Sequence, residues 1–211
     1  MRPAARNWSG AAMHDKTELL GVKGSWREVV DDCRATVGKE SLGHEPSWQF
    51  KRSILIAEHS PIRDLRVRWR WRDIPSWVAT HWSRHKWECF IRTQRSDRTG
   101  VPRGKLPQEA PVTFTGEANA QSLIDTWRKR LCYQASPETR KYAENFKMAL
   151  HPFEPELSDV LVPNCVYRGG CPELESCGFW ERFCPAEGTI QDRYNQYNDL
   201  FWARAGTEVD A

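Results

Sequence analysis

The segment from residue 65 to residue 72 alternates strictly between apolar and basic side chains. Side chains alternate across an extended strand, so this pattern predicts a strand with one buried face and one exposed face. The apolar side carries Leu65, Val67, Trp69 and Trp71, and the basic side carries Arg66, Arg68, Arg70 and Arg72. A chain with such a strand has to build a sheet that is covered on one face and open on the other.

The other expected elements surround this strand. Apolar residues at helical spacing predict helices over residues 26 to 35 and 48 to 59, and short strands are expected at residues 87 to 93 and 112 to 115. The regular strand and helix alternation of a doubly wound sheet is missing. The sequence therefore predicts the α+β class.

A third helix is predicted after residue 119. At helical spacing its apolar residues form one stripe, made of Ala120, Leu123, Ile124, Trp127 and Leu131. Asn119, Thr126 and Arg130 follow the border of this stripe. A border side chain is partly held by the protein and partly free to meet a ligand, so we expect functional residues there.

Two segments together resemble the active-site signature of flavin-dependent thymidylate synthases. One is the triplet Arg84-His85-Lys86, at the end of a helix expected over residues 77 to 86. The other is the predicted helix after residue 119 with its continuation to residue 140. Several residues of the second segment fall at the family's spacings, namely Asn119, Ser122, Leu123, Arg130, Ala135 and Glu138. Weaker matches at residues 33 to 41 and at Glu58-His59-Ser60-Pro61 extend the resemblance over residues 26 to 160.

The resemblance implies a role for each matched residue. Arg84, His85 and Arg130 would be catalytic, and Arg130 would also hold the pyrimidine nucleotide. Flavin contacts would come from Arg84, His85, Lys86, Asn119, Gln121 and Asp125. Nucleotide contacts would come from His81, Arg92, Arg95, Ser96 and Arg98. Four positions depart from the family pattern: His81 replaces Gln, Lys86 replaces Arg, Gln121 replaces Arg and Asp125 replaces Asn.

The implied reaction is methylation of deoxyuridylate at C5 to give thymidylate. It would use FAD, NADPH and methylenetetrahydrofolate, in a homotetramer whose sites combine residues of several subunits. The four departures suggest two alternatives. One is an enzyme that hydroxymethylates or hydroxylates C5 of a cytosine nucleotide. The other is a nucleotide-binding relative without catalytic activity.

Composition limits the other classes of function. The net charge of +3 over 211 residues is too small for a general nucleic-acid-binding surface. The arginines of residues 65 to 72 face away from the tryptophans, so we do not expect them to bind nucleic acid together. There is no long apolar run and no signal-like start, so we expect a cytoplasmic protein outside the membrane.

The chain divides into three expected parts. Residues 1 to 25 should form a flexible arm, residues 26 to 160 the catalytic domain, and residues 161 to 211 a Cys-rich loop followed by an aromatic helix. The extension carries Cys165, Cys171, Cys177 and Cys184. Their spacing lacks the close pairs of a zinc knuckle, so we expect reduced thiols, with a zinc site as the alternative. His81, His85 and Glu88 would offer another metal site if one helix continued through all three.

Overall fold

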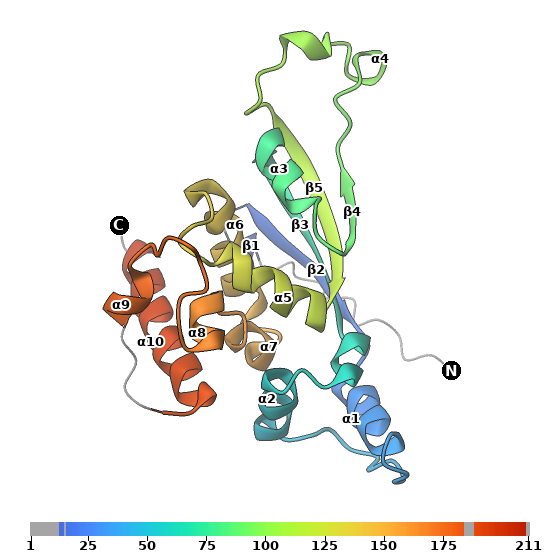
Figure 1. The fold of residues 1–211 in the computed structure, drawn as a ribbon. Helices are drawn as coiled ribbons and strands as arrows, with labels where there is room; N and C mark the ends of the chain where they lie inside the picture. The colour runs from blue at the N-terminus through green and yellow to red at the C-terminus, as the bar shows by residue number, and fades with distance from the viewer. Residues whose placement is uncertain (1–12, 15, 184–187, 210–211) are drawn as a thin grey trace.

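A computed structural model describes residues 13–14, 16–183 and 188–209. Its centre is an antiparallel sheet with the strand order β1-β2-β3-β5-β4 (Figure 1). The strands are β1 Met13–His14, β2 Thr17–Lys23, β3 Arg66–Pro75, β4 Glu88–Ile91 and β5 Pro111–Asn119. With its helices the chain is mixed α+β, which confirms the predicted class.

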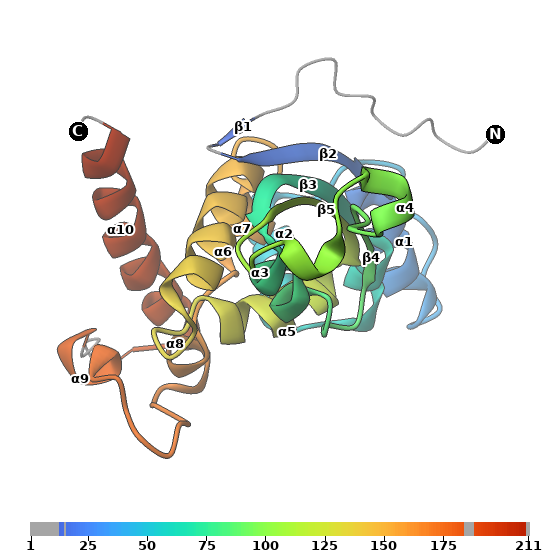
Figure 2. The same cartoon turned by 90° about the horizontal axis from the view of Figure 1, so that it is seen from above.

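The helices pack around the sheet. They are α1 Trp26–Ala35, α2 Trp48–Ile56, α3 Ser76–Trp82, α4 Ser96–Thr99, α5 Ala120–Arg130, α6 Pro137–Leu150, α7 Pro155–Asp159, α8 Asn164–Arg168, α9 Phe179–Phe183 and α10 Ile190–Val209, with short 3-10 turns at Ser60–Asp64 and Arg103–Lys105. Viewed from above, α6 lies between the sheet and α10 (Figure 2). Within the described ranges, no helix combines the length and the apolar composition needed to cross a membrane.

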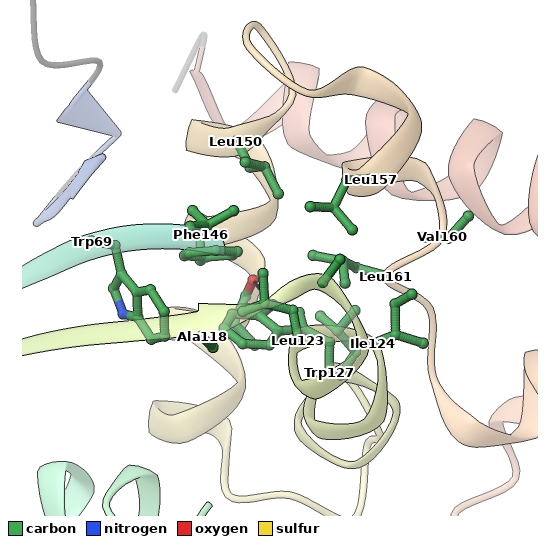
Figure 3. Close-up of a cluster of buried hydrophobic side chains, with 14 of the residues drawn as sticks. Trp69, Ala118, Leu123, Ile124, Trp127, Phe146, Leu150, Leu157, Val160 and Leu161 are labelled. Carbon is green, nitrogen blue, oxygen red and sulfur yellow. Dashed lines mark hydrogen bonds between the residues drawn. The ribbon is translucent and has the colours of Figure 1, made fainter. Parts of the chain in front are cut away.

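The covered face of β3 is lined with tryptophan, as its alternation predicts. Trp69 and Trp71 are fully buried. Trp69 packs against Trp127 of α5 and Phe146 of α6 (Figure 3), and Trp71 packs against Tyr142 of α6. The Trp69 ring lies directly over Gly116 of β5, where a Cβ atom would come within 2.4 Å of Cζ2 of the ring. Only glycine leaves room for this ring, because any side chain would displace it.

The opposite face of β3 carries the arginines, and acidic residues on the neighbouring strands meet three of them. Arg70 and Arg72 lie 3.4 and 2.7 Å from Glu18 of β2, and Arg66 lies 3.2 Å from Glu117 of β5. Facing strands bring these opposite charges together. Most of the basic stripe is thus paired within its own sheet.

Three expectations about element bounds need correction. The predicted arm of residues 1 to 25 contains β2, which pairs along β3 from Thr17 to Lys23; residues 1–12 and 15 lie outside the described part. Strand β5 reaches from Pro111 to Asn119, well beyond the four residues expected. Helix α3 ends at Trp82, so the triplet at residues 84 to 86 lies in a turn and not in the helix.

The C-terminal helix α10 packs on the domain through the predicted aromatic face. Tyr194, Tyr197 and Phe201 are buried, whereas Leu200 is exposed. Beneath them lies Lys147 of α6, which is fully buried and donates hydrogen bonds to the Ser158 carbonyl and to Oδ1 of Asn198, at 2.6 and 2.8 Å. Burial lowers the pKa of Lys147 to about 7. The extension is therefore fastened to α6 by polar contacts as well as by apolar ones.

Candidate functional site

Helix α5 forms one wall of the candidate site. It begins at Ala120 because the Asn119 side chain caps it, accepting a hydrogen bond from the Ser122 amide at 2.9 Å. Its predicted apolar stripe is buried, and Trp127 Nε1 donates to the Ala143 carbonyl of α6 at 2.9 Å. These contacts fix the rotation of the helix, so its polar edge faces away from the core.

The two resembling segments meet at Arg130. Its Nε donates to His85 Nε2 at 2.8 Å, and its Nη2 donates to the His81 carbonyl at 3.0 Å. The sequence separates Arg130 from His85 by 45 residues, and the contact forms because the turn after α3 folds back onto the end of α5. The structure thus brings Arg130 into direct contact with the triplet.

His85 is held in its neutral form by this environment. Burial, together with smaller contributions from the charges of Arg130 and Lys129, lowers its pKa to about 4. Because Nε2 accepts the hydrogen bond from Arg130, the single proton of the neutral ring lies on Nδ1. His85 thus offers a donor at Nδ1 and no positive charge.

A cleft of about 410 Å³ opens beside this contact. The turn after α3, the polar edge of α5 and helix α8 line it. Its lining residues are Arg84, His85, Lys86, Ser122, Asp125, Thr126, Arg128, Lys129, Asn164, Tyr167 and Arg168. Five of these are lysine or arginine and one is acidic, so the cleft favours an anionic ligand.

Arg128 forms the inner wall of the cleft, and the sequence analysis did not identify it. Its guanidinium pairs with the Glu58 carboxylate and lies 3.4 Å from the ring centre of Tyr167 in α8. Burial alone would raise the pKa of Glu58, but hydrogen bonds from Arg128 and Gln121 outweigh it and lower the pKa. Glu58 belongs to a stretch that supported the resemblance, yet no sequence signal pointed to its partner.

Helix α8 was also missed. Asn164, Tyr167 and Arg168 line the cleft although they belong to the extension beyond residue 160. Arg168 is exposed, and its Nε donates to Oδ1 of Asn164 at 3.1 Å. The helix is only five residues long and has no pronounced apolar period, which leaves little for sequence reasoning to detect.

The residues predicted to contact flavin occupy different places. Arg84, His85, Lys86 and Asp125 line the cleft, whereas Asn119 and Gln121 are not among its lining residues. Gln121 Nε2 instead donates to Glu58 Oε2 at 2.6 Å and to Asp125 Oδ1 at 3.2 Å. The resemblance to flavin-dependent thymidylate synthases implies an arginine at position 121. The chain instead has an amide, which bonds to the carboxylates of Glu58 and Asp125.

Residues predicted to contact the nucleotide are more scattered. Arg130 stands behind His85 and is not part of the cleft lining. His81 Nδ1 lies 3.2 Å from Oγ1 of Thr139 in α6, and burial lowers its pKa, with a smaller contribution from Arg130. Arg130 thus holds His85 at the cleft wall, whereas the His81 side chain faces α6.

The remaining predicted contacts lie on a long arm between β4 and β5. Arg92, Arg95, Ser96 and Arg98 are exposed and occupy the arm around α4, far from α5 in Figure 1. Arg95 pairs with Asp97 at 2.9 Å, and Ser96 Oγ accepts a hydrogen bond from the Arg103 amide at 3.0 Å. The structure does not bring these residues to the cleft of their own chain.

The metal candidates are not assembled in the described ranges. Because α3 ends at Trp82, His81, His85 and Glu88 do not share one helical face, and Glu88 instead lies 3.7 Å from Arg66. No group of three or more His, Cys, Asp and Glu side chains in the described part of the chain is placed to hold a metal ion. Cys184, one of the four expected zinc candidates, lies outside the described residues.

Comparison with known proteins finds solved structures with a similar fold. No protein-family model matches the chain, and no curated protein sequence matches it. A crystal structure of the UMP/dUMP methylase PolB from Streptomyces cacaoi, bound with 5-Br dUMP, superposes with a TM-score of 0.56 at 15% identity, covering 68% of this chain and 93% of PolB. The chain shares the fold of PolB. A second PolB structure, bound with 5-Br UMP, gives a TM-score of 0.52 at 15% identity, with 68% and 92% covered.

Proposed function

We propose that this chain is an enzyme that modifies C5 of a pyrimidine nucleotide, methylating deoxyuridylate to thymidylate. The observation that carries the proposal is the contact between Arg130 and His85 beside a basic cleft. It joins the two segments that resemble flavin-dependent thymidylate synthases, within a fold that a UMP/dUMP methylase also adopts. Neither segment alone would support the proposal.

The cleft suits a phosphate-bearing ligand of moderate size. Its volume lies near the lower end of the range for small-molecule pockets, about 300 to 1,000 Å³. Arg84, Lys86, Lys129 and Arg168 surround it with cations, which would hold phosphate groups of a nucleotide or of FAD. One mononucleotide-sized group fills such a volume, so a flavin beside it needs additional walls.

We propose that a neighbouring subunit supplies those walls in a homotetramer. The arm that carries Arg92, Arg95, Ser96 and Arg98 extends away from its own cleft, so it is free to reach another one (Figure 1). Phe90 of β4 and Val101 of the arm are exposed apolar residues that such a contact would cover. The arm arginines would then bind the nucleotide phosphate across the interface.

The residues of this chain would orient the reactants and stabilise charge. A flavin bound here would supply the hydride chemistry, with NADPH as its reductant and methylenetetrahydrofolate as the one-carbon donor. Arg130, fixed by His85 and the His81 carbonyl, lies behind the cleft lining and would stabilise negative charge on the pyrimidine ring through His85, without touching the ring. Neutral His85 would add a hydrogen bond from Nδ1 without a competing charge.

One observation favours a cytosine nucleotide as the alternative substrate. Asp125 places a carboxylate on the cleft wall, where the family often has an amide. A carboxylate accepts a hydrogen bond from the exocyclic amino group of cytosine, which uracil lacks. Hydroxymethylation or hydroxylation of C5 would then replace methylation.

A tritium-release assay separates these functions. Purified protein is supplied with FAD, NADPH and methylenetetrahydrofolate, and with deoxyuridylate or deoxycytidylate labelled at C5. Release from deoxyuridylate supports the proposal, and release from deoxycytidylate alone replaces it with the alternative. If neither substrate reacts and the protein takes up no FAD in an absorbance titration, the chain is a non-catalytic relative and the proposal fails.

Arg63→Met is the matched control for Arg130→Met in this assay, because both substitutions remove one guanidinium and the exposed Arg63 lies outside the cleft and the arm. Arg130→Met should still bind the nucleotide but release tritium far more slowly, whereas Arg63→Met should keep full turnover. Full turnover in the Arg130→Met variant would contradict the proposed role of the contact.

A further inference from the structure

The short helix α8 lies between α5 and α10 and is held from the α10 side (Figure 1). Arg193 of α10 donates from Nε to the Val166 carbonyl at 3.0 Å and from Nη2 to the Tyr167 carbonyl at 3.2 Å. The last carbonyls of a helix have no partner within that helix, so a guanidinium placed there satisfies them. Arg193 thus binds the C-terminal end of α8.

Helix α8 needs this support because it is too short to be stable alone. It has only five residues, and an isolated helix of that length does not persist in water. Its buried side chains, Cys165 and Val166, fix one face against the core. The helix ends at Gly169, which has a positive φ of 73° and lies beside the Arg193 guanidinium. The core therefore anchors the middle of α8, and Arg193 sets the position of its last turn.

The other side of α8 forms part of the cleft. The Tyr167 ring packs on the guanidinium of Arg128, which forms the inner wall, at 3.4 Å from the ring centre. Arg168 also lines the cleft, and its Nε donates to Oδ1 of Asn164 at 3.1 Å. An unbroken series of contacts therefore leads from Arg193 through α8 to the inner wall.

We propose that Arg193 is a positioning residue of the nucleotide site: by holding α8, it places Arg168 where that guanidinium contacts the phosphate of the nucleotide. Arg193 is not among the lining residues, so it would act without touching the ligand. Arg168 has further donors at its Nη atoms, which suit a phosphate group. The inference rests on the proposed function, because it takes the cleft as the nucleotide site.

The inference makes the C-terminal extension part of the binding site. The sequence analysis placed the catalytic domain at residues 26 to 160, before both α8 and α10 begin. If Arg193 positions Arg168, ligand affinity depends on a residue of α10 that lies outside both the cleft and the expected catalytic domain. A helix that only covers the core would have no such effect.

The first test measures binding of deoxyuridylate to the full-length chain by isothermal titration calorimetry. Arg168→Met should weaken binding about tenfold, because it removes a charged donor to the phosphate. Arg193→Met should weaken binding about 3- to 10-fold, as an indirect effect. Arg182→Met removes an exposed guanidinium from α9 of the same extension and should change binding by less than about twofold. Equal affinity in Arg193→Met and the wild type would overturn the inference.

Two further variants separate positioning from a general loss of stability. If Arg193 acts through Arg168, the double variant Arg168→Met/Arg193→Met should bind about as weakly as Arg168→Met alone. Losses that simply add would overturn the route through Arg168. Arg193→Lys keeps a charged donor to the carbonyls and should recover part of the affinity that Arg193→Met loses.

A measurement without ligand keeps this test separate from the test of the proposed function. Cys165 of α8 is buried, so iodoacetamide should label it slowly in the wild type and faster in Arg193→Met, with Cys33 of α1 as the internal reference. An equal rise at Cys33 would show that Arg193 stabilises the whole domain, and would overturn the positioning role.

The two proposals can therefore fail separately. A wild type that binds no deoxyuridylate would overturn the proposed function. Unchanged labelling of Cys165 in Arg193→Met would overturn the inference by itself, even where the nucleotide binds.

Discussion

The wall of the cleft and the arm between β4 and β5 were both expected to bind the nucleotide, yet they are built differently. The cleft wall is cross-linked from several directions, with Arg130 on His85 and Arg128 on Glu58. The arm's polar side chains mostly bond within the arm itself, as in the pair of Arg95 and Asp97. A match to a family pattern is therefore not enough to place a residue in a site. The cleft wall is held in position by the tryptophan core that packs behind α5.

The largest effect should come from removing that core. Trp127→Ala deletes a fully buried ring and its hydrogen bond to the Ala143 carbonyl, and should lower the free energy of unfolding by about 3 to 5 kcal/mol. Phe90→Ala, in β4 directly before the arm, removes a ring that is 66% exposed. It should change the free energy of unfolding by less than about 0.5 kcal/mol. Urea denaturation of both variants measures the difference, and equal effects would remove the contrast between the two regions.

The next effect concerns catalysis. Arg130→Met keeps the length of the side chain but removes the donors to His85 and the charge. We expect kcat/KM for the nucleotide to fall about 10²- to 10³-fold, with a small change in stability because Arg130 is only partly buried. Steady-state kinetics beside thermal unfolding separates these outcomes. An equal loss in kcat/KM and in stability would mean that Arg130 is structural.

The His85 titration tests the electrostatics of the cleft wall. Nuclear magnetic resonance should show His85 titrating with a midpoint of about 4. In Arg130→Met the midpoint should rise, because a neighbouring positive charge has been removed, but it should stay below 6.5 because burial remains the larger cause. The lowered pKa means that His85 contributes stability above its ordinary pKa of about 6.5, and that this contribution is lost as pH falls toward 4. A midpoint near 6.5 in the wild type would show that the contact with Arg130 does not persist in solution.

The smallest effect within one chain should come from the arm. Arg95→Ala should alter the affinity of an isolated subunit for the nucleotide by less than about threefold, because the residue lies outside the cleft. In the proposed tetramer the same substitution should weaken binding more strongly. Mixing Arg95→Ala and Arg130→Met subunits should then restore part of the activity, since some sites would combine an intact arm with an intact cleft. No recovery in the mixture would contradict the proposal that the arm completes the cleft of a neighbouring subunit.

Much of the fold could be predicted from the sequence because β3 and α5 have strongly periodic apolar residues. The strict alternation around Trp69 and Trp71 marks the buried face, and the stripe around Trp127 sets the rotation of α5. Strand β2 was missed since its sequence, TELLGVK, does not alternate and bends at Gly21, where the pairing with β3 shifts register. Its place depends on the long-range pairing with β3, which no local pattern encodes.

The candidate site could be predicted only in part, because it too depends on contacts between segments far apart in the sequence. Arg84, His85 and Lys86 came from a motif, and the structure puts them on the cleft wall. Arg128 was overlooked because a helical arginine is ordinarily solvated, and only the approach of Glu58 and Tyr167 makes it an inner wall. Such residues become functional candidates through tertiary contacts between segments that are far apart in the sequence.

The tryptophan cluster also gives the protein an internal optical probe. Trp82 and Trp87 stack with their ring centres 5.8 Å apart, and the His85 ring lies 5.1 Å from Trp87. Excitation energy passes readily among indoles at such spacing, and a protonated imidazole quenches indole emission. Occupancy of the neighbouring cavity, or a change in the charge of His85, should therefore alter the intrinsic fluorescence without any attached dye.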